Sequence, residues 1–101
     1  MTHAPLQRAH AYGVAVEFSD LGKWERDELR SEYDPHGPTI RINARVADAL
    51  TPDARERFVA LAIGHELYHH RERIGEISRH PDRATREAAA DAFARELVEP
   101  A

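Results

Sequence analysis

Cysteine is absent from this chain of 101 residues. The absence excludes a disulfide framework, thiolate ligands for a metal and a cysteine nucleophile. Any bound metal must therefore be held by histidine, aspartate or glutamate. A chain without cysteine is compatible with a reducing compartment, and we expect a cytoplasmic protein.

Long apolar runs and an excess of positive charge are missing as well. No run approaches the roughly 20 apolar residues that cross a bilayer, and residues 1–8 lack the apolar segment of a signal peptide. The formal net charge of -4 argues against direct nucleic-acid binding as the main function, because such domains usually carry a basic patch. The length allows one modest core, so we expect a single domain over residues 1–101.

Proline, glycine and capping residues divide the chain into expected elements. The turn signal at residues 34–38 predicts a hairpin, and Thr51-Pro52 is typical of a helix start. In chain order we expect a helix over residues 4–11, a strand over 14–18, a loop over 19–25, a hairpin pairing 29–33 with 39–43, a short helix over 45–50, a long helix from Thr51-Pro52 to about Arg73, a stop at Gly75, and a last helix opened by Pro81-Asp82 and ended by Pro100.

The segment His65-Glu66-Leu67-Tyr68-His69 lies within the expected long helix. Histidines four residues apart share one helix face, so both imidazoles can hold one tetrahedral ion. Glu66, next to His65, can then take a proton from water that the metal activates. Chance produces this pattern in roughly one chain in twenty of this composition. The pattern is stronger evidence for a metal site here because it lies within a capped amphipathic helix, the setting that the geometry requires. The alternative is a pair of polar residues on a solvated helix face.

A catalytic zinc ion needs a third protein ligand. The metzincin pattern requires a histidine ten residues after His65, where this chain has Gly75. Glu87 on the last expected helix is the better candidate, because an antiparallel pair of helices can bring it across to the ion. Asp91, one turn further, can accept the second N–H of a ligating histidine. The alternative for both acids is a solvated acidic face.

Three segments together resemble the ImmA/IrrE-like metallopeptidases. They are the strand Ile40-Arg41-Ile42-Asn43, the HExxH helix, and the stretch from Glu87 to Pro100, which reads E-x-x-x-D-x-F-A-x-x-L-x-x-P. The resemblance covers nearly the whole chain, from the Val14 strand to Pro100. It implies an α+β minimal zincin fold of the gluzincin type, with a small three-stranded sheet packed beside the HExxH helix and a glutamate-bearing C-terminal helix. It also implies one zinc ion bound by His65, His69 and Glu87, with Glu66 as the catalytic base.

The resemblance further implies a zinc-dependent endopeptidase, and it suggests a helix-turn-helix repressor as the substrate. We expect no direct nucleic-acid partner and no membrane partner. In such folds an exposed edge strand binds the substrate as an added strand. We expect residues 39–43 to be that edge, with Ile40, Ile42 and Asn43 contacting substrate. The alternative function is a metal-stabilised binding module without catalysis, partnering a transcription regulator or a toxin–antitoxin component. Manganese or iron would also suit a His/His/Glu site.

The residue that stabilises the oxyanion is not identified by any motif. His70 points about 100° away from His69 on a helix, so we expect it at the surface or at the rim of the cleft. Tyr68 stands where relatives often have glycine, and we expect it to narrow the cleft. By residue type, the candidates for the oxyanion role are Tyr33, Tyr68, His36, His70 and His80.

Overall fold

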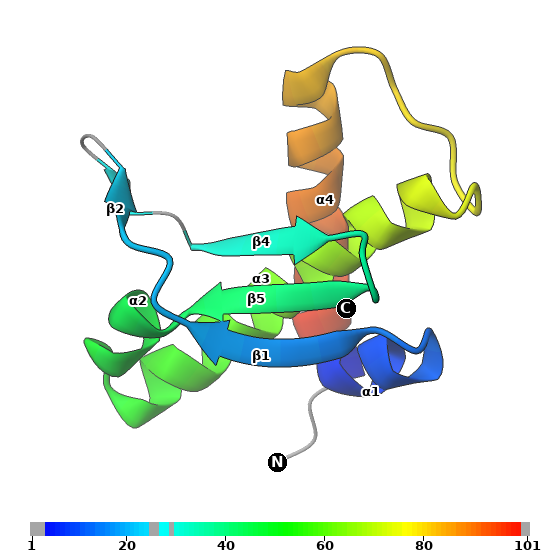
Figure 1. The fold of residues 1–101 in the computed structure, drawn as a ribbon. Coiled ribbons are helices and arrows are strands. Elements are labelled where there is room, and N and C mark those ends of the chain that lie inside the picture. The colour runs from blue at the N-terminus through cyan, green and yellow to red at the C-terminus, as the bar shows by residue number, and fades with distance from the viewer. Residues whose placement is uncertain (1–3, 25–26, 29, 100–101) are drawn as a thin grey trace.

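The structure, a computed structural model, describes residues 4–24, 27–28 and 30–99. It has the α+β architecture that the sequence predicts (Figure 1). The elements are α1 (Ala4–Ala11), β1 (Ala15–Ser19), β2 (Lys23–Trp24), β3 (Asp27–Glu28), β4 (Ser31–Asp34), β5 (Thr39–Asn43), α2 (Ala44–Asp48), α3 (Pro52–Arg73) and α4 (Arg83–Val98).

A three-stranded mixed sheet has the strand order β1-β5-β4. β5 pairs in parallel with β1 and antiparallel with β4. The predicted hairpin is therefore confirmed for residues 31–34 and 39–43, while Leu29, its expected first residue, lies outside the described residues. β2 and β3 form a separate antiparallel pair, where the sequence predicted a loop as far as residue 25.

β5 is the central strand of this sheet, so the prediction that residues 39–43 form an exposed edge is wrong. Ile40, Ile42 and Asn43 are each 0% exposed, and their side chains cannot contact a substrate. The alternating pattern correctly indicated one buried face, but alternation looks the same in a central strand and in an edge strand. In the described part of the chain, the edges of this sheet are β1 and β4.

Asn43 has a structural role at the junction of β5 and α2. Its Oδ1 atom accepts hydrogen bonds from the backbone N–H groups of Leu21 and Arg45, and its Nδ2 atom donates to the carbonyl of Gly22. The contact with Arg45 caps the N-terminus of α2. Burial of this amide is therefore explained by its hydrogen bonds.

The long helix α3 begins and ends as predicted. The side chain of Thr51 accepts a hydrogen bond from the backbone N–H of Ala54, and Pro52 occupies the first helical position. After Arg73 the chain turns at Gly75, whose φ of 79° is unfavourable for residues with a side chain. No helix in the part of the chain that the structure describes is long and apolar enough to cross a membrane.

The core lies between the sheet and the helices. Ile40 and Ile42 of β5 pack with Ile63 and Leu67 of α3, and Figure 1 shows α1 and α3 covering the same face of the sheet. This packing turns one face of α3 towards β4. The adjoining face of α3 is covered by α4, so the residues between these two contacts are held at a junction of three elements.

Helix α4 approaches α3 closely at one point. A Cβ atom added to Gly64 would lie 2.8 Å from the Cα atom and 2.9 Å from the Cβ atom of Ala94. Two small residues therefore allow near contact of the two backbones. Since Gly64 directly precedes His65, this contact sets the distance between the histidine-bearing helix and the acids of α4.

Candidate metal centre

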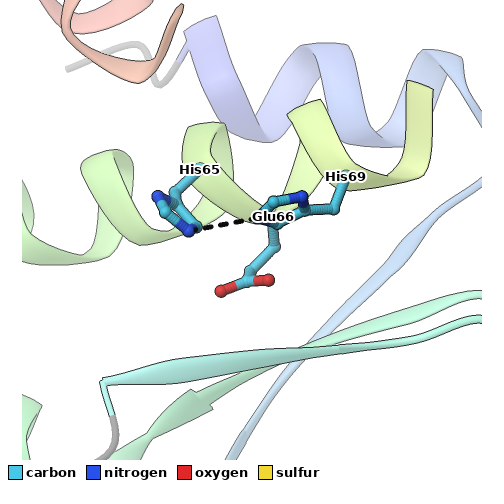
Figure 2. Close-up of side chains that lie close together, drawn as sticks. All are labelled: His65, Glu66 and His69. Carbon is cyan, nitrogen blue, oxygen red and sulfur yellow. Dashed lines mark hydrogen bonds between the residues drawn. The ribbon is translucent and has the colours of Figure 1, made fainter. Parts of the chain in front are cut away.

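His65 and His69 project from the same face of α3, as their spacing predicts (Figure 2). Their Nε2 atoms are 3.3 Å apart. A tetrahedral zinc ion with metal–nitrogen bonds of about 2.0–2.1 Å separates two ligand nitrogens by about 3.3–3.4 Å. The two imidazoles therefore have the separation that ligation of a single ion requires.

Glu87 reaches the same point from α4. One of its carboxylate oxygens lies 2.7 Å from Nε2 of His69 and the other lies 3.4 Å from Nε2 of His65. The predicted three donors thus converge from α3 and α4, two consecutive helices. The donor set of two neutral nitrogens and one carboxylate suits zinc and leaves a coordination position for water. The residues present fit the ion that the sequence predicts.

A second carboxylate competes for the role of third ligand. His65, Glu66 and His69 also offer ligand atoms within 4.8 Å of one another. The carboxylate of Glu66, however, projects from α3 towards β4 (Figure 2), and its Oε2 atom accepts a hydrogen bond of 2.7 Å from the hydroxyl of Ser31. Glu87 lies beside both imidazole Nε2 atoms, so the geometry favours Glu87 over Glu66 as a third ligand.

The remaining ring nitrogens of both histidines contact carboxylates. Nδ1 of His65 lies 2.7 Å from Asp91, the acid that spacing selected for this role. Nδ1 of His69 lies 2.8 Å from Glu72, a residue that we did not predict for this role. A carboxylate that accepts the Nδ1–H bond leaves the Nε2 lone pair free for a metal and orients the ring. The i, i+3 spacing of His69 and Glu72 was the available sequence signal.

Glu72 is itself held by α4. Its side chain is only 5% exposed, and one of its oxygens lies 3.6 Å from Nε of Arg86. Neither of these two atoms has a hydrogen-bond partner among the described residues. A buried carboxylate needs a compensating charge, so Arg86 is the cation that balances Glu72 behind the second histidine.

Glu66 is nearly buried, with 7% of its surface exposed. Burial raises the pKa of its carboxyl group, while the hydrogen bond from Ser31 and the neighbouring imidazoles act in the opposite direction. A raised pKa makes a carboxylate a stronger base, which suits a group that accepts a proton. Ser31 precedes Glu66 by 35 residues, and no local pattern in the sequence links the two.

A cleft of about 430 Å³ opens beside these groups. One part of its wall is the metal centre, and the other part combines apolar residues of α3 and α4 with two arginines. The lining residues are Arg30, Ser31, Phe58, Leu61, Ala62, His65, Glu66, Glu87, Asp91, Ala94 and Arg95. None of the five residues considered for the oxyanion role belongs to this set.

The positions of His70 and Tyr68 differ from expectation. His70 is buried, with 4% exposed, because its face of α3 is turned towards β4 and α1. Its Nδ1 atom lies 2.6 Å from the hydroxyl of Tyr33, and its ring packs edge-on against Tyr12. The prediction of a surface position was therefore wrong. Tyr68 packs against Phe93 of α4 and does not line the cleft.

Comparison with known proteins identifies the family of the chain. The family model Peptidase M78, described as the IrrE N-terminal-like domain, matches residues 9–101. Searches of curated proteins and of solved structures found no match. The matched range contains α3 and α4 in full and so includes every group of the metal centre. The chain therefore belongs to the Peptidase M78 family of IrrE N-terminal-like domains.

Proposed function

We propose that this chain is a zinc-dependent endopeptidase. The observation that carries the proposal is the convergence of His65, His69 and Glu87 on one point, with the nearly buried Glu66 beside it at the wall of an open cleft. Membership of a peptidase family supports hydrolysis of peptide bonds. The two-histidine, one-carboxylate donor set supports zinc in preference to harder cations, which prefer oxygen ligands.

Glu66 is the residue that moves protons in the proposed reaction. A bound zinc ion supplies Lewis-acid activation of water and of the scissile carbonyl. Glu66 accepts a proton from the attacking water and delivers it to the leaving amine. Its raised pKa favours holding that proton between the two steps. The hydroxyl of Ser31 donates to Oε2 and keeps the carboxylate turned into the cleft.

The substrate backbone is proposed to bind along β4. This strand is an edge of the described sheet, and its first residue, Ser31, lines the cleft. An extended peptide that adds to β4 by main-chain hydrogen bonds passes directly in front of Glu66. This assignment replaces β5, which is buried. A helix-turn-helix repressor is the substrate we propose to test first, on the strength of the resemblance between the sequences.

The test combines metal analysis with hydrolysis. The purified protein should contain one zinc ion per chain, and His65→Ala should lose it. Glu66→Gln should keep the metal and lose hydrolysis of a repressor or an unstructured protein by at least about 100-fold, since it cannot act as a base. Elemental analysis and mass spectrometry of fragments provide the two measurements.

Two results would contradict the assignment. If wild-type protein binds no stoichiometric metal, or if His65→Ala retains it fully, the metal centre is wrong. If metal binds but a partner forms a stable complex without fragments, the protein is a metal-stabilised binding module instead of a peptidase.

A further inference from the structure

Two arginines line the cleft without taking part in the metal centre. Arg30 directly precedes β4, and Arg95 lies in the last turn of α4. Both side chains are exposed, and among the described residues neither forms an ion pair or a side-chain hydrogen bond. The acid one helical turn before Arg95 is Asp91, whose carboxylate contacts His65 instead. Both guanidinium groups therefore remain available to a ligand in the cleft.

The cleft that these arginines line also has an apolar part. Phe58 and Leu61 of α3 are half-buried there, and the small side chains of Ala62 and Ala94 make room beside them. An apolar side chain of a substrate would be removed from water on this surface, which favours binding. A carboxylate on the same substrate would pair with one or both guanidinium groups, for which planar bidentate contact is the preferred geometry.

The direction of β4 determines whether the arginines and apolar residues of the cleft contact the part of the substrate before or after the scissile bond. Ser31 contacts Glu66 and Tyr33 contacts His70, so β4 and α3 run in the same direction. A peptide added antiparallel to β4 runs the other way, and its C-terminal half leaves the metal centre towards Arg30. Asp91 contacts His65 and Glu87 contacts His69, so α4 runs opposite to α3, and Arg95 lies towards the same end as Arg30. For a peptide in this orientation, both arginines face residues that follow the scissile bond.

We propose that Arg30 and Arg95 determine specificity by selecting substrates that carry a carboxylate beside an apolar side chain, just C-terminal to the scissile bond. The carboxylate belongs either to an aspartate or glutamate side chain or to the C-terminus of the peptide. This inference rests on the proposed peptidase function and adds the substrate class. The chain as a whole carries a net charge of -4. Nonspecific electrostatic attraction would therefore not draw an anionic substrate to it, so a preference for a carboxylate must come from local groups.

Matched synthetic peptides provide the experiment. Sites of cleavage in a mixture of unstructured peptides, identified by mass spectrometry, define a core sequence. Peptides with Leu-Glu or Leu-Gln after the scissile bond are then compared, each with a free or an amidated C-terminus. We expect kcat/KM to be about fivefold higher for the carboxylate-bearing peptides, the range of exposed ion pairs, and the preference to shrink in 0.5 M salt.

Variants of the two arginines test whether a preference for carboxylate-bearing peptides arises in the cleft. Arg30→Gln and Arg95→Gln should each reduce the preference, and the double variant should abolish it. Arg57→Gln is the matched control, because Arg57 pairs with Glu99 and does not line the cleft. The four peptides also separate the two carboxylate sources: a side-chain preference persists in amidated peptides, whereas a terminal preference disappears.

The outcomes distinguish this inference from the proposed function. Equal cleavage of acidic and neutral peptides, or a preference that survives in the double variant, overturns the inference and leaves the peptidase standing. If no peptide is cleaved, the proposed function fails. Binding of fluorescein-labelled peptides to zinc-loaded Glu66→Gln protein then decides the inference, and equal Kd values for acidic and neutral peptides would overturn it.

Discussion

At the scale of single residues, each metal-centre histidine is held by a carboxylate on its far ring nitrogen. Asp91 performs this function for His65 from α4, and Glu72 performs it for His69 from α3 itself. The two carboxylates differ in exposure: the side chain of Asp91 is 60% exposed and that of Glu72 is 5% exposed. Contacts in low dielectric are stronger, so Glu72 should be the more important of the two for ring orientation.

Replacement of Glu72 tests this role. Glu72→Ala removes the acceptor for Nδ1 of His69 and leaves Arg86 without its charge partner, so zinc affinity should fall by about 10- to 100-fold. Competition with a chromophoric chelator measures the affinity. Glu96→Ala is the control, because Glu96 is an exposed acid on α4 outside the cleft. Unchanged affinity in Glu72→Ala, with native circular dichroism, would show that His69 needs no such support.

At the scale of elements, one side of the sheet carries a charge network around Arg41 of β5. Its guanidinium group contacts Glu17 of β1 and both Glu32 and Asp34 of β4. This arginine therefore joins all three strands. Hydrogen bonds from the backbone N–H of His36 and from Arg41 lower the pKa of Asp34 from 3.8 to about 2.

The lowered pKa of Asp34 predicts a pH dependence of stability. A carboxyl group whose pKa is lower in the folded than in the unfolded state stabilises the fold above its unfolded pKa. That contribution is lost as the pH falls from about 4 to about 2. Asp34→Asn should therefore be less stable than wild type at neutral pH, and the difference should shrink towards pH 2. Urea midpoints measured across this range test the prediction, and a constant difference would refute it.

The contact between α3 and α4 predicts an unusual effect of alanine at Gly64. In an unobstructed helix, glycine to alanine stabilises by about 1 kcal/mol. Here the new Cβ would lie within 3 Å of the backbone of Ala94, so α4 must shift and the protein should lose about 1–3 kcal/mol, as overpacked cores do. Because α4 carries Glu87, zinc affinity should fall as well. Chemical denaturation and chelator competition measure both effects, and a stabilised Gly64→Ala protein would contradict this account.

At the scale of the whole molecule, the candidate metal ligands join α3 and α4, two helices that also pack against each other directly. An ion bound only by the folded state stabilises it by about 4 kcal/mol at a free concentration 1,000 times its Kd. Removal of zinc with EDTA should therefore lower the Tm by at least 10 °C in a chain of about 100 residues. The Tm of His65→Ala should not respond to EDTA. An equal response in both proteins would mean that the metal stabilises the fold from a different site.

Local chemistry determined much of this protein from the sequence alone. Caps, prolines and glycines act within a few residues, so the bounds of α3 and α4 follow from Thr51, Gly75 and Asp82 without knowledge of the fold. The pairing of His65 with His69 is also local, because one helical turn places both rings on one face. Glu87 and Asp91 could be predicted for the same reason. They are four residues apart on the next helix, so one helical turn places both acids on one face.

Tertiary structure alone decided the rest, because it concerns residues brought together by packing. Alternation in residues 39–43 revealed a buried face, but only the pairing of β5 with both β1 and β4 made it central and left β4 as the edge beside the cleft. The burial of His70 and the contact of Ser31 with Glu66 depend on which face of α3 meets the sheet. The same packing places Arg30 and Arg95, 65 positions apart in the sequence, on one cleft wall. Contacts of this kind leave no periodic trace in a sequence.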